Sequence, residues 1–355
     1  MLNFRSKSVL GLDIGASSVK LVEIAQTGGE YEVQRIGFAP LPPEAIIQGS
    51  FMNAPAIANS VREAYEDGGF KVKDVAASVS GHSVIVKRIQ LPSQSQEELD
   101  ESIKWEAEQY IPFDINEVNL DYQILQEESP DGQMDVLLVA AKKDLINDYQ
   151  GVVSDAGLNL AVLDVDAFAL GNMYESNYEA ETSGAIALVD IGAAVININV
   201  LNGTVPAFTR DITSGGNQYT EEIQKTLNLS FDEAERIKIG GEPGESSKDV
   251  VPLEFEEAMR DVSEQLLGEI QRSLDFYRAT TSNVPIERVL LCGGAAHVPG
   301  LDRLFEERIE IPFEIADPFA RVALGCSVAD QERARELGPS LGVAVGLGLR
   351  RRDET

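Results

Sequence analysis

The sequence predicts an α/β fold of two related lobes, with a smaller unit inserted into the first lobe. One observation is a repeat: Asp-Ile-Gly-Ala occurs at 13–16 and again at 190–193, each time between two short apolar runs. A second is the alternation of candidate strands and helices over most of the 355 residues. A third is the segment 93–167, whose charged helices and separate pair of strands fit an inserted α+β unit.

The first lobe is predicted to begin with three strands in a meander, at residues 9–13, 19–24 and 31–39. A helix follows, with Ile57 and Val61 on its apolar face. Residues 75–80 and 84–90 are predicted to be the last two strands of this lobe, because each is an apolar run between turn residues.

The inserted unit is predicted to open with a capping box, Ser95-x-x-Glu98, and an amphipathic helix that buries Leu99 and Ile103. Two paired strands should follow around the turn at 130–132. A helix at 144–156 and a strand at 158–164 complete the unit that the sequence predicts.

The second lobe is predicted to repeat the strand pair of the first, starting at Ala185, with a third strand at 205–211. Residues 220–282 are predicted to be helical, apart from a Gly/Glu/Ser loop at 240–247. A strand at 288–291 then runs into Gly293-Gly294, and a helix is expected from Pro299. The last predicted helix is an apolar run at 340–349.

Composition narrows the class of protein. The net charge is −30, which argues against nucleic acid and against adhesion to an anionic membrane surface. No apolar run approaches the roughly 20 residues needed to span a bilayer, and no signal-peptide pattern opens the chain, so we expect a cytoplasmic protein without direct membrane insertion. The two cysteines match no disulfide framework or metal motif.

The repeated turn indicates a site for a polyphosphate. A strand that ends in Asp can hold Mg²⁺ or its water shell, and the glycine and small residues after it let backbone N–H groups approach phosphate oxygens. Two such turns that face each other would clamp a phosphate chain from both sides. The P-loop, dinucleotide-binding and protein-kinase motifs do not occur in the sequence.

Three motifs in order, at 12–20, 189–195 and 292–299, resemble the two phosphate motifs and the adenosine loop of the actin/Hsp70/sugar-kinase superfamily. Within it, the chain resembles the PilM family of type IV pilus assembly proteins nearly end to end. The stretches that carry this resemblance are IKWEAEQYIPFDINEVNLDYQIL (103–125), LDVDAFALGN (163–172), FTRDI (208–212) and SLGVAVGLGLR (340–350).

This resemblance implies an actin-like two-lobe fold of duplicated ribonuclease-H-like lobes, with an insert of the type called 1C in the cell-division protein FtsA. The implied division is subdomain 1A at 1–92, 166–183 and 318–355; 1C at 93–165; 2A at 184–219 and 284–317; and 2B at 220–283.

The resemblance also implies an ATP and Mg²⁺ site, with Asp13 holding the metal directly or through water. The residues implied to bind the nucleotide are Gly15, Ser17, Ser18 and Lys20 in the first turn, Asp190 and Gly192 in the opposing turn, and Gly215, Gly216, Asn217, Glu235, Lys238, Gly293 and Gly294 around the ribose and base. From spacing alone, Glu235 and Lys238 could equally form a solvated ion pair.

The opposing turn departs from the superfamily pattern, because Val195 offers no hydroxyl where active members have Thr. In active members of the superfamily, a residue on the helix after the insert orients the attacking water. In this sequence that position falls near Asp166, the one catalytic candidate, with Asp164 as its neighbour. Both aspartates could instead cap the following helix. We therefore expect tight nucleotide binding with slow or absent hydrolysis, and leave open whether the chain is an enzyme.

The family resemblance implies a scaffold that binds the short N-terminal cytoplasmic tail of the membrane protein PilN, together with other pilus assembly proteins; self-association stays open. Such a protein would be peripheral to the inner membrane through its partner. We expect the tail to dock between about 87–91 and the insert, near Trp105. Two alternatives remain: a small-molecule kinase of the same superfamily, and an FtsA-like cell-division scaffold.

Overall fold

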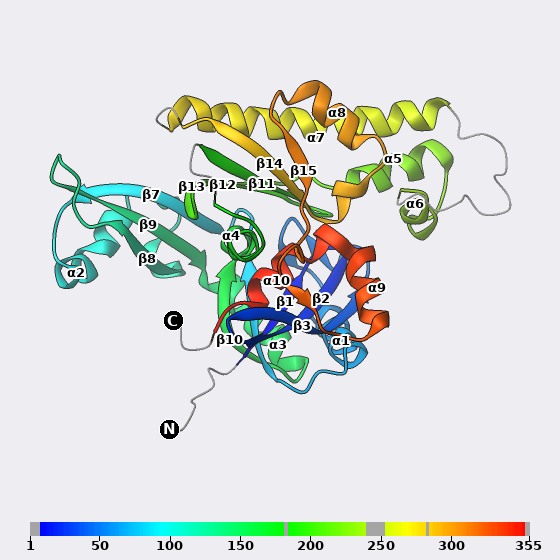
Figure 1. Cartoon of the computed structure of the whole chain (residues 1–355), viewed down its shortest axis with the longest axis horizontal. Coiled ribbons are helices and arrows are strands. Elements are labelled where there is room, and N and C mark those ends of the chain that lie inside the picture. Colours follow the sequence, from blue (N-terminus) through cyan, green and yellow to red (C-terminus); the bar gives the residue numbers. More distant parts are fainter. Residues whose placement is uncertain (1–7, 181–183, 239–252, 282–283, 352–355) are drawn as a thin grey trace.

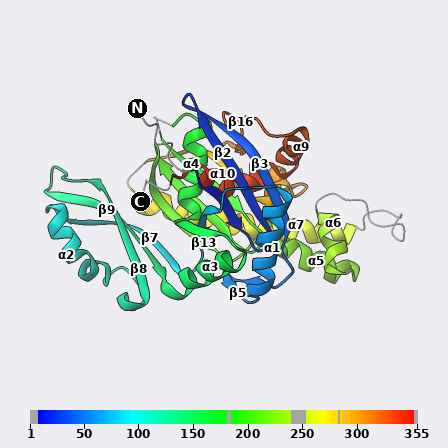
Figure 2. The ribbon, with the colours of Figure 1, turned by 90° about the horizontal axis from the view of Figure 1, so that it is seen from below.

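The computed structural model describes residues 8–180, 184–238, 253–281 and 284–351. Figure 1 shows two lobes stacked on each other and a small unit that projects to one side. Seen from below in Figure 2, the small unit lies at one end of the molecule and helices α5 and α6 lie at the other. The predicted loop at 240–247 lies outside the described residues.

The first lobe is built on a six-stranded sheet in the order β10-β6-β1-β2-β3-β16. Its central strand β1 is buried along nearly its whole length, with an antiparallel neighbour on one side and a parallel neighbour on the other. The strands are β1 (Leu10–Ile14), β2 (Ser18–Thr27), β3 (Glu30–Pro40), β6 (Asp74–Val79), β10 (Asn159–Val165) and β16 (Ala323–Leu324). A small hairpin, β4 (Ile46–Ile47) and β5 (Ser50–Phe51), precedes the first helix.

The second lobe repeats this arrangement in a five-stranded sheet, β13-β12-β11-β14-β15. Strand β11 pairs antiparallel with β12 and parallel with β14, as β1 does with β2 and β6. The strands are β11 (Ala185–Ile191), β12 (Ile196–Asn202), β13 (Val205–Ile212), β14 (Ile286–Cys292) and β15 (Phe313–Ile315). The matching pairing makes the lobes duplicates in topology.

Helices cover both faces of each sheet, as the alternation in the sequence predicts. α1 and α3 cover one face of the first sheet, α4 and α10 lie between the two sheets, and α5, α7 and α8 cover the second sheet. The helices are α1 (Ala54–Asp67), α2 (Gln96–Ala107), α3 (Lys143–Asp155), α4 (Asp166–Asn177), α5 (Asn217–Leu227), α6 (Phe231–Lys238), α7 (Leu253–Thr280), α8 (Leu301–Arg308), α9 (Val328–Leu337) and α10 (Gly342–Gly348). The helix expected at Pro299 begins at Leu301, because Gly300 has a left-handed φ of 85°.

The small unit is a three-stranded sheet, β7-β9-β8, with α2 packed on one face. Its strands are β7 (Val84–Pro92), β8 (Val118–Gln126) and β9 (Gln133–Lys142), and the predicted capping box at Ser95 is present at the start of α2. That this unit is a 1C subdomain stays a prediction, as does the division into four subdomains.

Strand pairing corrects two assignments near the small unit. Residues 84–90 were expected in the first lobe, but β7 pairs with β9 of the small unit. The helix and strand expected within the insert, now α3 and β10, belong to the first lobe: β10 pairs with β6, and α3 packs in the same core as α1. The small unit therefore spans 84–142 and not 93–165. Its two ends meet, because the Lys142 amide donates to the Ser83 carbonyl at 3.0 Å.

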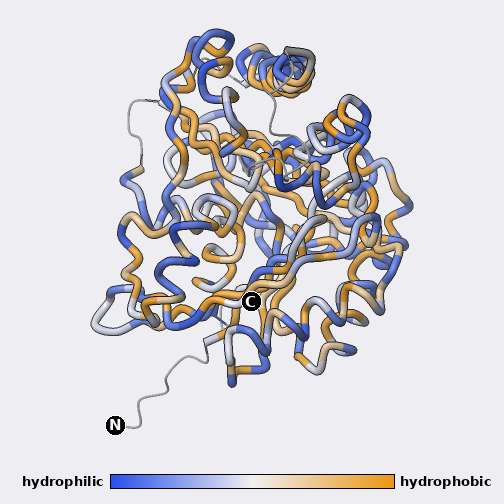
Figure 3. The backbone as a smooth tube through the Cα atoms, turned by 90° about the vertical axis from the view of Figure 1, so that its right-hand side faces the viewer, coloured by the Kyte–Doolittle hydropathy of each residue, from blue (hydrophilic) through white to orange (hydrophobic). Residues whose placement is uncertain are grey.

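Hydrophobic and hydrophilic residues are interleaved along the chain in Figure 3. No helix among the described residues is both long enough and apolar enough to cross a membrane.

The contact between α10 and α4 is made by backbone. A Cβ added at Gly346 would lie 1.7 Å from the Ala169 carbonyl oxygen, and one at Gly11 would lie 2.0 Å from that of Ala344. The apolar run at 340–349 thus contains a helix that lies closer to α4 and β1 than would be possible if Gly346 and Gly11 carried side chains. This contact holds the two sheets at their observed separation.

We expect Gly346→Ala to lower the free energy of unfolding by about 3 kcal/mol, because the added methyl overlaps a backbone carbonyl that cannot rotate away. Thermal and urea unfolding measure the change. Gly151→Ala is the matched control: Gly151 is exposed on α3 with open space at its Cβ, so this variant should gain up to about 1 kcal/mol. Equal effects of the two substitutions would contradict the close contact.

Candidate functional site

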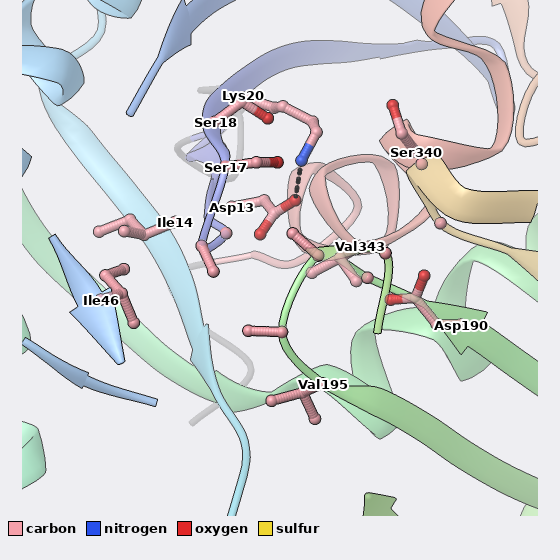
Figure 4. Close-up of a pocket in the computed structure, with 18 of the residues that line it drawn as sticks. Asp13, Ile14, Ser17, Ser18, Lys20, Ile46, Asp190, Val195, Ser340 and Val343 are labelled. Carbon is pink, nitrogen blue, oxygen red and sulfur yellow. Dashed lines mark hydrogen bonds and ion pairs between the residues drawn. The ribbon is translucent and has the colours of Figure 1, made fainter. Parts of the chain in front are cut away.

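A cavity of about 280 Å³ lies where the two lobes face each other. The turns of the β1–β2 and β11–β12 hairpins enter it from opposite sides, and Figure 4 shows Asp13 and Lys20 on one side with Asp190 across from them. The repeated Asp-Ile-Gly-Ala therefore forms two opposing turns, as the sequence predicts.

The two hairpins match residue by residue. The Gly15 amide donates to the Ser18 carbonyl at 3.1 Å, and the Gly192 amide donates to the Val195 carbonyl at 3.0 Å. In the strand pairing, Asp13 is opposite Lys20, and Asp190 is opposite Asn197. The same backbone turn thus presents a carboxylate beside a cation in one lobe and a carboxylate beside an amide in the other.

That difference decides the charge in the cavity. Lys20 is buried, and its ammonium lies 2.9 Å from the Asp13 carboxylate. The side-chain amide of Asn197 instead donates to the carboxylate of Asp211, on the neighbouring strand β13, at 2.8 Å. Among the described residues, no Lys or Arg side chain forms an ion pair with Asp190. The first turn therefore carries the cation that a phosphate would meet.

The pKa values of Asp190 and Asp166 are both raised above the ordinary value of an aspartate. Burial, followed by the negative charge of Asp13, raises the pKa of Asp190 to about 7. Burial also raises the pKa of Asp166 to about 6, against hydrogen bonds from Ser78 and Ser80 that lower it. Both pKa values are raised for the same reason: the carboxyl groups are buried, and each lies near another aspartate.

Glycine shapes the third wall of the cavity. Gly293 follows β14 with φ of 88°, and a Cβ there would lie 2.3 Å from a carboxylate oxygen of Asp190. The start of α5 braces the opposing turn, since the amides of Gly216 and Asn217 donate to the Gly192 and Ala193 carbonyls. A side chain at Gly293 would push this turn away, because its Cβ would also lie 2.4 Å from the Ile191 carbonyl oxygen.

The Glu235–Lys238 pair is not solvated. The Lys238 side chain is buried, and its ammonium contacts Glu235 at 2.5 Å, the Thr220 hydroxyl at 3.0 Å and the Gly216 carbonyl at 3.4 Å. Both residues line the cavity. The alternative that Glu235 and Lys238 form a solvated ion pair on the surface is therefore wrong.

Most of the residues predicted for the site line this one cavity. They are Asp13, Gly15, Ser17, Ser18, Lys20, Asp166, Asp190, Gly192, Gly216, Glu235, Lys238, Gly293 and Gly294. Gly215 and Asn217 do not line it; a Cβ on Gly215 would lie 2.5 Å from the Gly192 carbonyl oxygen, so it packs behind the turn.

Asp164 and Asp166 do not cap α4. The Asp164 carboxylate is paired with Arg350 at 2.6 Å, away from the cavity, and Asp166 accepts a hydrogen bond from Ser78. Among the described residues, no group of three or more His, Cys, Asp or Glu side chains is placed to hold a metal by itself.

Several lining residues were not anticipated, among them Asn197, Ser80, Tyr149 and Ser340. Asn197 could have been found, since it occupies the place of Lys20 in the repeat. The others come from distant parts of the chain and carry no local motif.

A second, larger cavity of about 960 Å³ separates the small unit from the first lobe. Strands β8 and β10, each the last strand of its sheet, contribute to its walls together with Phe168 of α4 and Arg350. Residues 87–91 do not line it, because β7 is at the opposite edge of the small sheet from β8. The docking position expected at 87–91 therefore lies outside this cavity and stays a prediction.

A family model described as type IV pilus assembly protein PilM matches residues 11–352. The chain belongs to the PilM family. Among solved structures, this PilM-family chain is similar to the "PilM-PilN type IV pilus biogenesis complex", with 31% identity and a TM-score of 0.84 over 98% of this chain and 99% of that one.

Two more distant similarities agree on the fold. The cell division protein FtsA of Streptococcus pneumoniae serotype 2 (strain D39) is 25% identical over 84% of this chain and 72% of its own length. The ethanolamine utilization protein EutJ of Carboxydothermus hydrogenoformans is 16% identical with a TM-score of 0.55, over 98% and 90% of the two chains. The predicted actin-like two-lobe fold is confirmed.

The raised pKa values predict a pH dependence of stability. The unfolded chain releases the Asp190 proton near its ordinary value of 3.8 and the folded chain near 7, so the folded state binds more protons between these values and stability falls as pH rises. Asp190→Asn makes position 190 neutral at every pH and leaves the other ionisable groups of the cavity in place. Without nucleotide and with EDTA, we expect the melting temperature of the variant minus that of wild type to be about 3 °C larger at pH 8 than at pH 5.

The exposed Asp131 provides the control, because Asp131→Asn should give a difference that does not change with pH. A pH-independent difference for Asp190→Asn would contradict the proton held at Asp190.

Proposed function

We propose that this chain is an ATP-binding, actin-like scaffold of type IV pilus assembly, located at the cytoplasmic face of the inner membrane. In this proposal it binds the N-terminal cytoplasmic tail of PilN and connects it to other pilus assembly proteins. The observation that carries the nucleotide part is the pair of matched hairpin turns that face each other across one cavity. The family and the similarity to a PilM–PilN complex support the partner.

In this proposal the cavity would hold Mg-ATP between the two lobes. Lys20 and the amides and hydroxyls of the first turn would bind the terminal phosphates, and Asp13 would hold the Mg²⁺. Gly293 and Gly294 would lie against the base, and Glu235 and Lys238 would bind near the ribose and base. The metal would neutralise carboxylates that the protein itself leaves poorly compensated.

Slow hydrolysis at most is consistent with the same residues. Asp166, which would have to orient a water, already accepts a hydrogen bond from Ser78, and its pKa is raised to about 6 by burial. Val195 adds no hydroxyl from the opposing turn. The site is therefore better equipped to hold a nucleotide than to cleave it.

The Asp13 carboxylate should be required for the metal and not for the phosphates. Calorimetry should show that Asp13→Asn weakens Mg-ATP binding at least about tenfold, because Mg²⁺ loses its protein ligand. ATP without metal should bind no worse, because Lys20 is freed from its carboxylate partner.

Asp166→Asn is the matched control at the same cavity and should stay within about threefold of wild-type affinity. Unchanged Mg-ATP affinity in Asp13→Asn would refute the assignment of the phosphate site, whatever the control shows.

The second cavity offers the best place for an extended peptide. Strands β8 and β10 are edge strands, each with a strand partner on one side only, and both contribute to its walls. A peptide can add to such an edge through backbone hydrogen bonds while side-chain pockets give specificity. We place the PilN tail here, in place of the expected position at 87–91.

Removal of the small unit should separate the two binding activities. Replacing residues 85–140 by a short Gly-Ser linker keeps Val84 and Ala141, which are paired with each other across β7 and β9 and are buried in the core of the first lobe. The shortened protein should keep Mg-ATP binding and lose binding of a synthetic PilN tail peptide. Cutting at 93–164 would instead remove α3 and β10 from the core of the first lobe.

A point variant refines this test. Ala161 lines the cavity from β10, so Ala161→Phe should weaken the tail at least about tenfold by filling the space. Lys87→Ala, on β7, should leave the affinity unchanged. If Lys87→Ala weakens the tail and Ala161→Phe does not, the tail binds elsewhere.

A further inference from the structure

Trp105 lies outside every core of the protein. It is the only tryptophan in the chain, and it is 72% exposed on α2. The inner stripe of the same helix, formed by Leu99, Ile103 and Ala107, is buried against the small sheet. The indole is therefore not needed to hold α2 in place.

The surroundings of Trp105 are strongly acidic. Glu98, Glu101 and Glu108 are exposed and follow the helical spacing of three and four residues, so they lie on one stripe with the indole. Glu97 and Asp100 are also exposed beside this stripe, and Lys104 is the only basic residue of α2. We call the stripe of Glu98, Glu101, Trp105 and Glu108 the outer face of α2.

An aromatic ring flanked by carboxylates matches one side chain in particular. An arginine guanidinium can stack on an indole and at the same time form paired hydrogen bonds with a carboxylate. A purely apolar partner would leave the glutamates desolvated and unpaired, which costs free energy. A second copy of this chain is disfavoured, because each carries a net charge of −30.

The outer face is separate from the sites already described. Figures 1 and 2 both place α2 at the end of the small unit that is distant from the two lobes. Trp105, Glu101 and Glu108 do not line the larger cavity, although Lys104 of the same helix does. The outer face of α2 therefore lies beside that cavity and is not part of its wall.

We propose that the outer face of α2 is a docking surface for an arginine-bearing segment of another protein, with a guanidinium stacked on Trp105 and paired with Glu101 or Glu108. This inference does not depend on the proposed nucleotide or PilN sites. It gives the small unit a second partner surface, selective for basic segments in an otherwise acidic molecule.

The single tryptophan makes the test direct, because its emission reports this face alone. An acetylated hexa-arginine peptide, titrated into the full chain at low salt, should change the emission of Trp105 in a saturable way. Hexalysine should bind at least about threefold more weakly, because an ammonium lacks the planar stacking and the paired hydrogen bonds.

Matched charge variants decide between this face and the overall charge. Glu101→Gln/Glu108→Gln should weaken hexa-arginine at least about fivefold, since two carboxylates beside the ring are lost. Glu306→Gln/Glu307→Gln removes the same two charges from exposed positions on α8 and should stay within about twofold. Unfolding curves check that both variants fold.

Three results of the titrations would each overturn the proposal: no change in emission, equal affinity for the two peptides, or equal weakening by the two double variants. Equal weakening would mean that the peptide follows net charge only. A fourth result comes from calorimetry. Trp105→Ala, followed by calorimetry, should reduce hexa-arginine binding as much as the loss of Glu101 and Glu108, and an unaffected affinity would count equally against the stacking.

Discussion

The close approach of α10 to α4 is the constraint on which the rest of the structure depends. Gly346 and Gly11 let helix backbone touch helix and strand backbone, so the two sheets are held apart by only one layer of helices. Both hairpins project from the ends of these sheets. Their turns face each other across one small cavity because the separation of the sheets is set by backbone and not by adaptable side chains.

Within that frame, the two lobes share a backbone and differ in charge. Lys20 and Asn197 occupy the same place in the two hairpins, yet only Lys20 compensates its aspartate. Asn197 binds Asp211, whose other carboxylate oxygen accepts from the Gly81 amide just before the small unit begins. The matching positions of the two hairpins therefore differ in role: Lys20 supplies a cation to the cavity, and Asn197 connects its hairpin through Asp211 to the loop at Gly81.

Much of this was predictable from local sequence, and the exceptions have one cause. The repeat, the capping box at Ser95 and the glycine turns are local signals, and the structure contains each of them. The partner of β7 and the sheet of β10 are long-range pairings. Alternating apolar residues in 84–90 fit either sheet equally well, and nothing within the strand selects β9. Asn197 is an intermediate case, since only the comparison of the two repeats reveals it.

The link through Asp211 joins the second lobe's hairpin to the loop that leads into the small unit. Gly81 belongs to this loop between β6 and β7, Asn197 lines the cavity, and the Asp211 carboxylate accepts a hydrogen bond from each of them. The small unit is also packed on both lobes, because Val84 of β7 and Ala141 of β9 are buried in the core that contains α1 and α3, and β7 contacts β13. A shift of the second lobe's hairpin would therefore reach the small unit through the Asp211 hydrogen bonds and through the contact of β7 with β13, and not through a single hinge.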